Sequence, residues 1–242
     1  MDAYAAQWKG SRPKQEDAYA VRHFPDGSLL LVCDGMGGHS FGELASASAA
    51  ESFVAQMEES ADSGEPLMKR MEQALHAANA AVHRISEEQK AFGGTTLLAC
   101  YVSRGLLRWV SVGDSPLYLW RRERLVRLNE DHSMRPVYAQ YLTFDSLNRS
   151  KWAGAHTLRS ALMGDEIPMI DAPERPYPLL PGDRLIICSD GLDTLVGQDP
   201  MPSELRNLLN RRGGNLAALL VEADRHLHDE YADNVTVLTM DV

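Results

Sequence analysis

The sequence lacks a long apolar run, an excess of basic residues and an even number of cysteines. No stretch of its 242 residues approaches the roughly 18 apolar residues that a membrane-spanning helix requires. Residues 1–10 (MDAYAAQWKG) contain neither the basic segment nor the apolar segment of a secretory signal. We therefore expect a cytoplasmic protein that does not associate with membranes.

The three cysteines do not predict a disulfide framework. Cys33, Cys100 and Cys188 all lie in apolar, strand-like segments, so we expect buried, reduced thiols. A cysteine-dependent phosphatase needs an arginine six residues after its nucleophile, and no cysteine here is followed by one. The residues at those three positions are His39, Leu106 and Thr194.

Nucleotide-binding loops are absent as well. There is no Walker loop, and Gly35-x-Gly37 is followed by Ser40 where a dinucleotide fingerprint needs a third glycine. These absences exclude kinase and dehydrogenase functions of those types.

The charge balance argues against a nucleic-acid partner. The chain has 24 Lys and Arg residues against 34 Asp and Glu residues, a net charge of −10. One basic concentration remains, and its position on an expected hairpin predicts a solvated face rather than a phosphate-binding track. It consists of Arg104, Arg108, Arg121, Arg122, Arg124 and Arg127.

The most informative stretch is SLLLVCDGMGGH, residues 28–39. Its apolar residues 29–33 predict a buried strand that ends at Asp34, and the glycines that follow leave the backbone open to close approach. A lone Asp-Gly pair would indicate only a turn. However, an apolar run also ends at Asp114 (LRWVSVGDS) and at Asp190 (RLIICSDG). Three such carboxylates at strand ends predict a metal site.

The periodicity of the remaining chain predicts an α/β sandwich of antiparallel sheets covered by helices, in a single domain over residues 1–242. Short turns between the strands of residues 95–128 predict an antiparallel meander, and a helix start is expected at residues 131–133. The expected strands are residues 18–24, 28–33, 95–103, 106–113, 116–121, 124–128, 184–189 and 233–242, and the expected helices are residues 41–57, 67–85 and 216–231.

Acidic residues recur at the ends of these elements. An all-oxygen ligand set suits Mg²⁺ or Mn²⁺, whereas zinc would require clustered His and Cys. Carboxylates that converge without a cation repel one another, so convergence would itself imply bound metal. Two such ions can share a water molecule and stabilise an in-line displacement at phosphorus. The acidic residues at element ends are Glu16, Asp17, Asp34, Asp114, Asp190 and Asp233.

Six ordered motifs together resemble the PPM family of metal-dependent Ser/Thr protein phosphatases, and the chain resembles a compact bacterial member. The motifs are RPKQED (residues 12–17), DGMGGH (34–39), GGTT (93–96), VGDS (112–115), CSDGL (188–192) and DNVT (233–236). The resemblance implies a four-layer α-β-β-α sandwich of the α/β (α+β) class, with two mainly antiparallel sheets and a metal site at the strand ends.

The resemblance also implies a role for each matching residue. Two Mn²⁺ or Mg²⁺ ions are expected, and a third, weaker one. Arg12 would clamp the substrate phosphate, Asp17 would orient water, and Asp34 would bridge the two ions. Glu16 and the Gly35 carbonyl would complete one ion site, Asp190 and Asp233 would hold the other ion, and Asp114 would help Asp190 to hold the third.

The chain departs from the family pattern at several positions. Gln15 replaces a usual Asn, a change we expect to be tolerated. Met36 stands where eukaryotic members have a His proposed as general acid, so that role is unassigned. His39 and His132 are expected to be structural. Residues 135–170 correspond to the family's flap, which bears on substrate choice, and contain the aromatic residues Tyr138, Tyr141, Phe144 and Trp152.

The sequence therefore predicts a phosphatase that hydrolyses phosphoserine and phosphothreonine without forming a phosphoenzyme. Its expected partners are phosphorylated proteins and a cognate bacterial Ser/Thr kinase, with the chain itself a monomer. Control of type VI secretion is a narrower hypothesis. Two alternatives stay open: a hydrolase of small phosphate esters, which a deep closed pocket would favour, and a non-catalytic binding module on the same fold.

Overall fold

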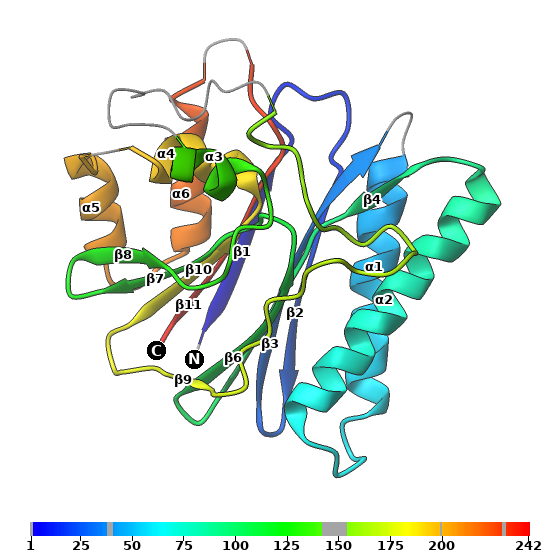
Figure 1. Ribbon diagram of the computed structural model, residues 1–242. Coiled ribbons are helices and arrows are strands. Elements are labelled where there is room, and N and C mark those ends of the chain that lie inside the picture. The colour runs from blue at the N-terminus through cyan, green and yellow to red at the C-terminus, as the bar shows by residue number, and fades with distance from the viewer. Residues whose placement is uncertain (1, 38–40, 142–153, 199, 229–230) are drawn as a thin grey trace.

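Two antiparallel β-sheets stack face to face, and helices cover their outer faces (Figure 1). The structure is a computed structural model that describes residues 2–37, 41–141, 154–198, 200–228 and 231–242. The predicted sandwich of antiparallel sheets is confirmed, and its layers follow the order α-β-β-α.

The first sheet has the strand order β2-β3-β5-β6-β9, and β4 pairs with β3. Helices α1 and α2 lie along its outer face (Figure 1). The strands are β2 (Asp17–Phe24), β3 (Gly27–Gly37), β4 (Gly93–Thr95), β5 (Leu97–Ser103), β6 (Leu106–Val112) and β9 (Tyr177–Pro178), and the helices are α1 (Phe41–Glu59) and α2 (Leu67–Gln89).

The second sheet has the order β1-β11-β10-β7-β8, and α5 and α6 cover its outer face (Figure 1). Its strands are β1 (Ala3–Trp8), β7 (Leu117–Arg121), β8 (Arg124–Arg127), β10 (Arg184–Cys188) and β11 (Val235–Asp241). The remaining helices are α3 (Arg135–Tyr141), the 3₁₀ turn η2 (Asp190–Leu192), α4 (Asp193–Val196), α5 (Ser203–Asn210) and α6 (Leu216–Arg225).

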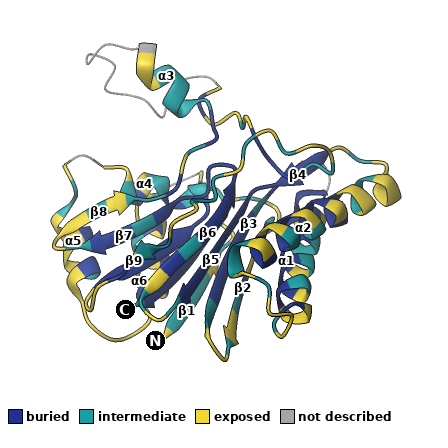
Figure 2. Ribbon diagram, turned by 60° about the horizontal axis from the view of Figure 1, so that its bottom comes forward, coloured by how far each residue is buried: buried dark blue, intermediate teal, exposed yellow. Residues whose placement is uncertain are grey.

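The apolar run of β3 is continuous because both faces of the strand are covered. Leu29 and Leu31 pack in the layer between the sheet and helices α1 and α2, whereas Leu30 and Val32 pack between the two sheets. Successive side chains of a strand point to opposite faces, so a strand with two covered faces is apolar at every position. The buried surfaces of both sheets are dark blue in Figure 2.

Three details of the predicted elements are wrong. The strands of residues 95–128 do not form one meander, because β5 and β6 belong to the first sheet and β7 and β8 to the second. The last helix ends at Arg225 rather than at residue 231, and β3 continues to Gly37. Strand β1 and helix α5 were not predicted.

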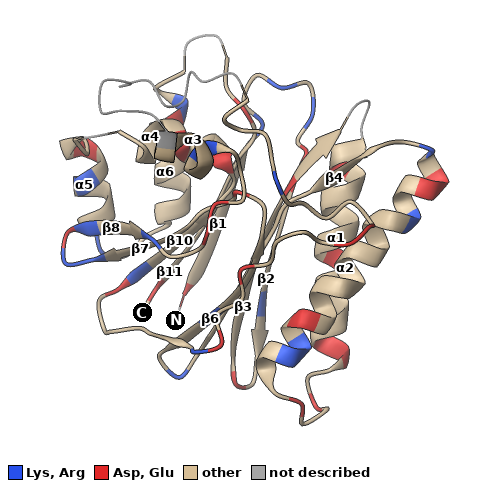
Figure 3. Ribbon diagram, in the orientation of Figure 1, with Lys and Arg blue, Asp and Glu red and all other residues tan. Residues whose placement is uncertain are grey.

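Figure 3 shows in blue where Lys and Arg residues lie along the ribbon, and three arginines of the predicted basic concentration form local contacts. Arg121 forms an ion pair with Asp183, and Arg127 forms one with Asp131. Arg108 donates to the backbone carbonyl of Glu174. These contacts occupy three of the six arginines, so the group is not a continuous phosphate-binding track.

Other expectations concern burial and the flap. All three cysteines are buried and unpaired, as predicted. In the described parts of the chain, no helix combines the length and apolarity needed to cross a bilayer. The segment predicted to be a flap, residues 135–170, includes α3 and the described residues 154–170. Its residues 142–153, with Phe144 and Trp152, lie outside the described residues, as does His39.

Candidate functional site

Antiparallel pairing gathers the predicted acidic residues at one end of both sheets. Strand β2 begins at Asp17, opposite Asp34 of β3. In the second sheet, Asp190 follows the end of β10 and Asp233 precedes the start of β11, and these two strands are antiparallel neighbours. Asp114 lies where the chain crosses from β6 to β7, and therefore from one sheet to the other. Residues distant in sequence consequently share one region of the surface.

A pocket of about 450 Å³ opens at this end. Its walls come from both sheets and from the segment of residues 156–158. The predicted site residues among those that line it are Arg12, Glu16, Asp34, Gly35, Asp114, Asp190 and Asp233. Asp17 is not part of this lining and lies buried beside it.

Strand β3 changes its partner at Asp34. Up to Val32 it pairs with β5, and from Gly35 it pairs with β4. At the change, the backbone N–H of Asp34 donates to Oγ1 of Thr96 at 2.9 Å, and the Asp34 carbonyl accepts from the Thr96 N–H at 2.8 Å. The buried Thr96 thus fixes the backbone of Asp34 in the middle of a strand rather than at its end.

Two glycines allow the backbone to approach closely beside the acidic residues. A Cβ at Gly35 would collide with the carbonyl oxygens of Gly42 and Glu16, and a Cβ at Gly191 would collide with the carbonyl oxygen of Asn234. The glycines that follow Asp34 and Asp190 therefore let neighbouring segments close around these carboxylates.

Asp17 is buried and bound to the second sheet. Its Oδ2 accepts hydrogen bonds from Ser189 Oγ at 2.8 Å and Thr236 Oγ1 at 2.6 Å. Its Oδ1 is buried and has no hydrogen-bond partner in the part of the chain that the structure describes. One carboxylate oxygen thus joins the two sheets. No hydrogen bond from the described residues offsets the burial of the other oxygen.

Arg12 is held at the rim of the pocket from two sides. Its Nη2 donates to Oδ2 of Asp233 at 2.6 Å, and its Cζ lies 5.7 Å from the centre of the Tyr231 ring. The Arg12 and Asp233 side chains are 39% and 40% exposed. Nε of Arg12 is buried and has no partner among the described residues. Nη2 is the nitrogen that bonds to protein among the described residues, so Nη1 keeps its donors available for an anion in the pocket.

The loop that carries Arg12 is tied down by Asn234. The side-chain oxygen of Asn234 accepts from the Glu16 N–H at 2.7 Å, and its Nδ2 donates to the carbonyls of Lys9 and Lys14 at 2.8 and 3.0 Å. One amide thus closes the loop between β1 and β2 onto the start of β11.

Asp114 is paired with the base of the flap. Oδ2 of Asp114 lies 3.3 Å from Nη2 of Arg135, the first residue of α3. The same guanidinium forms ion pairs with Asp131 and Asp193. Behind Asp114, the Nδ1 of buried His132 accepts the N–H of Gly113 at 3.2 Å. His132 lies ahead of α3 and outside the residues that line the pocket, and α3 begins two residues after the predicted helix start.

His156 enters the pocket from the flap, and sequence analysis did not find it. Its Nδ1 lies 3.6 Å from Oδ2 of Asp190. Ligand atoms of His156, Asp114 and Asp190 all lie within 4.8 Å of one another. The position expected to hold a third ion from two carboxylates therefore also has an imidazole beside it.

The carboxylates are electrostatically unfavourable without a cation. Burial and the neighbouring Asp190 raise the pKa of Asp114 to about 7, although Arg135 opposes the shift. Burial raises the pKa of Asp17 to about 7, and burial together with the surrounding aspartates raises the pKa of Asp34 well above its usual value. Burial also acts against ionisation of Asp190, but its contacts with His156 and Arg135 leave its pKa below the usual value.

These observations fit a site for divalent cations. Mutual repulsion and burial disfavour the ionised carboxylates, and hard cations bound to the oxygen atoms would reverse this effect. Most of the potential metal-ligand atoms in the pocket lining are oxygen atoms, which suits Mg²⁺ or Mn²⁺.

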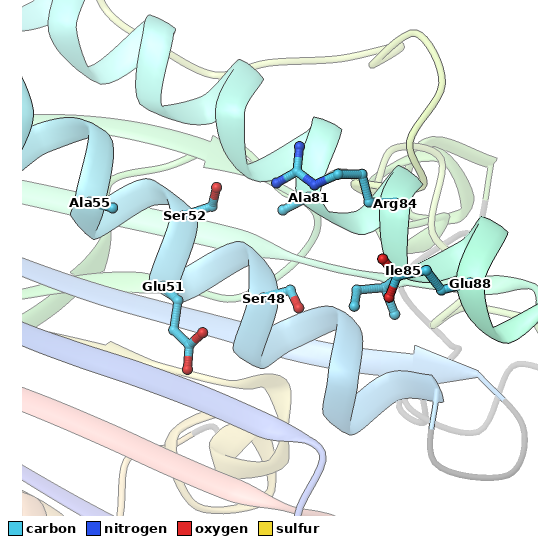
Figure 4. Close-up of a pocket in the computed structure, with 8 residues that line it drawn as sticks. All are labelled: Ser48, Glu51, Ser52, Ala55, Ala81, Arg84, Ile85 and Glu88. Atoms are coloured by element: carbon cyan, nitrogen blue, oxygen red, sulfur yellow. The ribbon is translucent and has the colours of Figure 1, made fainter.

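A second hollow, of about 310 Å³, lies between α1 and α2 (Figure 4). Its two carboxylates, Glu51 and Glu88, come from different helices and lie apart in Figure 4. The hollow therefore lacks the converging carboxylates of the first pocket. It is lined by Ser48, Glu51, Ser52, Ala55, Ala81, Arg84, Ile85 and Glu88.

Two helix-covered antiparallel sheets with carboxylates at their shared end are the features of the PPM class. The family model described as Protein phosphatase 2C matches residues 10–229, and the chain belongs to this family. The resemblance predicted from the six motifs is confirmed.

One curated relative and two solved structures illustrate the similarity. The serine/threonine protein phosphatase PstP of Mycobacterium tuberculosis is 32% identical over 221 residues, which is 88% of this chain and 40% of PstP. The chain thus spans about two fifths of the length of that relative. A crystal structure of the PstP catalytic domain in complex with two manganese ions aligns with a TM-score of 0.73 at 28% identity, over 99% of this chain and 97% of that one. PppA, a regulatory component of type VI secretion in Pseudomonas aeruginosa, aligns with a TM-score of 0.74 at 25% identity, over 98% and 96%.

Proposed function

We propose that this chain is a Mn²⁺- or Mg²⁺-dependent phosphatase that hydrolyses phosphoserine and phosphothreonine in proteins. The observation that carries the proposal is the convergence of Glu16, Asp34, Asp190 and Asp233 on one pocket with Arg12 at its rim. The PstP structure with two manganese ions and the family membership of the chain support it. The four ligands expected from the motifs are all present, which argues against a non-catalytic module.

Different residues of the site would hold the cations and orient the water. Glu16, the Gly35 carbonyl, Asp34, Asp190 and Asp233 would hold two cations. Bound there, the cations would supply the positive charge that lowers the pKa of water and stabilises negative charge at phosphorus. Asp34, fixed by Thr96, would be a central ligand in holding these cations. Asp17, fixed by Ser189 and Thr236, would orient and accept protons from water beside them.

Arg12 would bind the phosphate oxygens. Its guanidinium offers a planar set of donors that matches two oxygens of a phosphate group, and Asp233 and Tyr231 orient it. Met36 lines the pocket and has no proton to donate, so the leaving alkoxide must be protonated by another group.

The exposure of the rim favours a protein substrate over a small ester. The Arg12, Asp233 and His156 side chains are 39%, 40% and 48% exposed. A phosphorylated side chain that protrudes from a protein could reach such an open site, whereas a small metabolite would gain little enclosure there. Within this proposal, the flap over residues 135–170 contributes to substrate choice.

We propose a single catalytic domain that works as a cytoplasmic monomer and opposes a bacterial Ser/Thr kinase. The similarity to PppA supports a role in type VI secretion as one hypothesis for the pathway. Kinase genes next to the gene for this chain would test it.

The decisive experiment compares hydrolysis of a phosphothreonine peptide and a small aryl phosphate, with Mn²⁺ or with chelator, by wild type and Asp190→Asn. We expect metal-dependent release from the peptide, lost in the variant, while circular dichroism shows that both are folded. Folded wild type that releases phosphate from neither compound in Mn²⁺ would refute the proposed activity. Release from the small ester alone would identify a metabolite hydrolase instead.

A further inference from the structure

The flap places an imidazole against the acidic pocket in a defined position. His156 lies in a turn closed by a hydrogen bond from the Thr157 N–H to the Gly154 carbonyl at 3.0 Å. The Thr157 carbonyl accepts the N–H of Met134 at 2.9 Å, and Ser133 and Leu158 form a β-bridge. The backbone on the C-terminal side of His156 is therefore tied to the segment that leads into α3.

The ring approaches two carboxylates at distances suited to a shared cation. Ligand atoms of Asp114, His156 and Asp190 lie within 4.8 Å of one another. Two ligand atoms on opposite sides of an octahedral cation are separated by roughly 4.2 Å, twice the usual bond length. Small side-chain rotations would therefore bring all three atoms to one ion.

The charges around this position are compatible with a cation. Asp114 is 3% exposed and shares Arg135 with Asp131 and Asp193, so the guanidinium is not committed to Asp114 alone. Asp190 faces the pocket with a side chain that is 23% exposed. The two aspartates supply negative charge, and His156 supplies a neutral nitrogen donor when it is deprotonated.

The donor set here differs from that expected for the other two ions. Glu16, Asp34 and Asp233 offer only oxygen, which accommodates Mg²⁺ as well as Mn²⁺. Imidazole binds first-row transition metals, Mn²⁺ the least tightly among them, whereas Mg²⁺ prefers oxygen ligands. We infer that His156 is a nitrogen ligand of the cation held by Asp114 and Asp190, and that it makes this position selective for a transition metal such as Mn²⁺. This inference rests on the proposed metal-dependent function and adds a ligand from the flap and a metal preference.

The test is a direct spectroscopic search for nitrogen bonded to the metal. The full chain is loaded with Mn²⁺, and pulsed electron paramagnetic resonance measures the coupling of the metal to ¹⁴N, with ¹⁵N-histidine labelling to identify imidazole. We expect a histidine nitrogen coupling in wild type, its loss in His156→Gln and its retention in His226→Gln. His226 is the matched control because it lies 3.1 Å from Glu222 on the exposed surface, where Mn²⁺ could bind adventitiously.

Calorimetric titration supplies a second readout. Wild type should bind one Mn²⁺ ion at least about tenfold more tightly than His156→Gln does, while titration with Mg²⁺ should give similar curves for the two proteins. Protein that binds Mn²⁺ and hydrolyses the phosphothreonine peptide, but shows no histidine coupling, would overturn the inference and leave the phosphatase proposal standing. Coupling that persists in His156→Gln and disappears in His226→Gln would overturn it as well. Protein that neither binds Mn²⁺ nor hydrolyses the peptide would overturn both.

Discussion

Asp17 and Asp34 lie directly opposite each other on the neighbouring antiparallel strands β2 and β3. Opposite residues of such a pair project from the same face of the sheet, and two like charges there are destabilising. Burial is the main cause of the raised pKa of both carboxyl groups, and the charge of Asp17 adds to the effect on Asp34. A cation beside Asp34 would relieve this repulsion, so the strand pair links folding stability to metal binding.

Metal-free protein should therefore lose stability as the pH rises. A carboxyl group with a raised pKa in the fold binds more protons in the folded state than in the unfolded state. Its stabilising effect is complete below its unfolded pKa of roughly 4 and declines as the pH rises toward its folded pKa, which is about 7 for Asp17. In chelator, Asp34→Asn should be more stable than wild type at pH 7.5, by about 1 kcal/mol or more, and the advantage should shrink at pH 5.

Urea denaturation at the two pH values measures this difference. Added Mn²⁺ should stabilise wild type much more than Asp34→Asn, because the variant lacks a carboxylate that would hold the cations. An Asp34→Asn protein that is less stable than wild type in chelator at pH 7.5 would contradict the repulsion argument.

Replacing Arg12 by lysine should weaken catalysis on both substrates. Lysine keeps the positive charge but lacks the planar pair of donors. The substitution also removes the 2.6 Å contact between the Arg12 guanidinium and Asp233. Loss of one charge-assisted hydrogen bond, about 1.5–3 kcal/mol, predicts a fall in kcat/KM of roughly 10- to 150-fold for the peptide and for the aryl phosphate. Steady-state kinetics would measure the fall. An unchanged kcat/KM for both substrates would show that Arg12 does not bind the phosphate in the reaction.

Tyr231 should position Arg12 through its ring rather than through its hydroxyl group. The ring centre is 5.7 Å from the guanidinium carbon, and the residue is 69% exposed. A cation–π contact of about 0.5–1 kcal/mol predicts a roughly two- to fivefold increase in KM for Tyr231→Leu. Tyr231→Phe keeps the aromatic face and should resemble wild type, so equal defects in both variants would assign the effect to the hydroxyl group.

The layers of the fold could be predicted because they depend on local patterns. The apolar run before Asp34 and the helical spacing after Phe41 each carry their own signal. The sheet to which a strand belongs has no such local signal. Strands β6 and β7 are consecutive in sequence and look like a hairpin, yet the chain crosses at Asp114 from one sheet to the other. The sequence pattern could have predicted strand β1. Tyr4, Ala6 and Trp8 occupy alternate positions and pack against the apolar cluster that includes residues of α6.

The same distinction between local pattern and distant contact applies to the residues of the site. The acidic residues lie in recognisable motifs, and the structure brings all of them except the buried Asp17 to the lining of one pocket. Asn234 and Thr96 lie inside quoted motifs, yet their roles depend on backbone groups far away in sequence. His156 lies in an aperiodic stretch with no motif around it, and only the return of the flap to Asp190 gives it a partner. Contacts between distant loops leave no pattern in the sequence.

His132 supports the turn that carries Asp114. Because Nδ1 of His132 accepts the Gly113 N–H, the ring must be neutral with its proton on Nε2. Burial lowers the pKa of this histidine, so its contribution is complete above the unfolded pKa of roughly 6.5 and is lost as the pH falls toward the lowered value. His132→Asn should cost about 1–3 kcal/mol at pH 7, and less at pH 5, because only wild type is penalised by protonation. Denaturant titrations at both pH values measure the difference, with His226→Asn on the exposed surface as the control. A cost that stays constant between pH 7 and pH 5 would mean that the ring does not hold Gly113 as a neutral acceptor, and that another contact fixes the turn at Asp114.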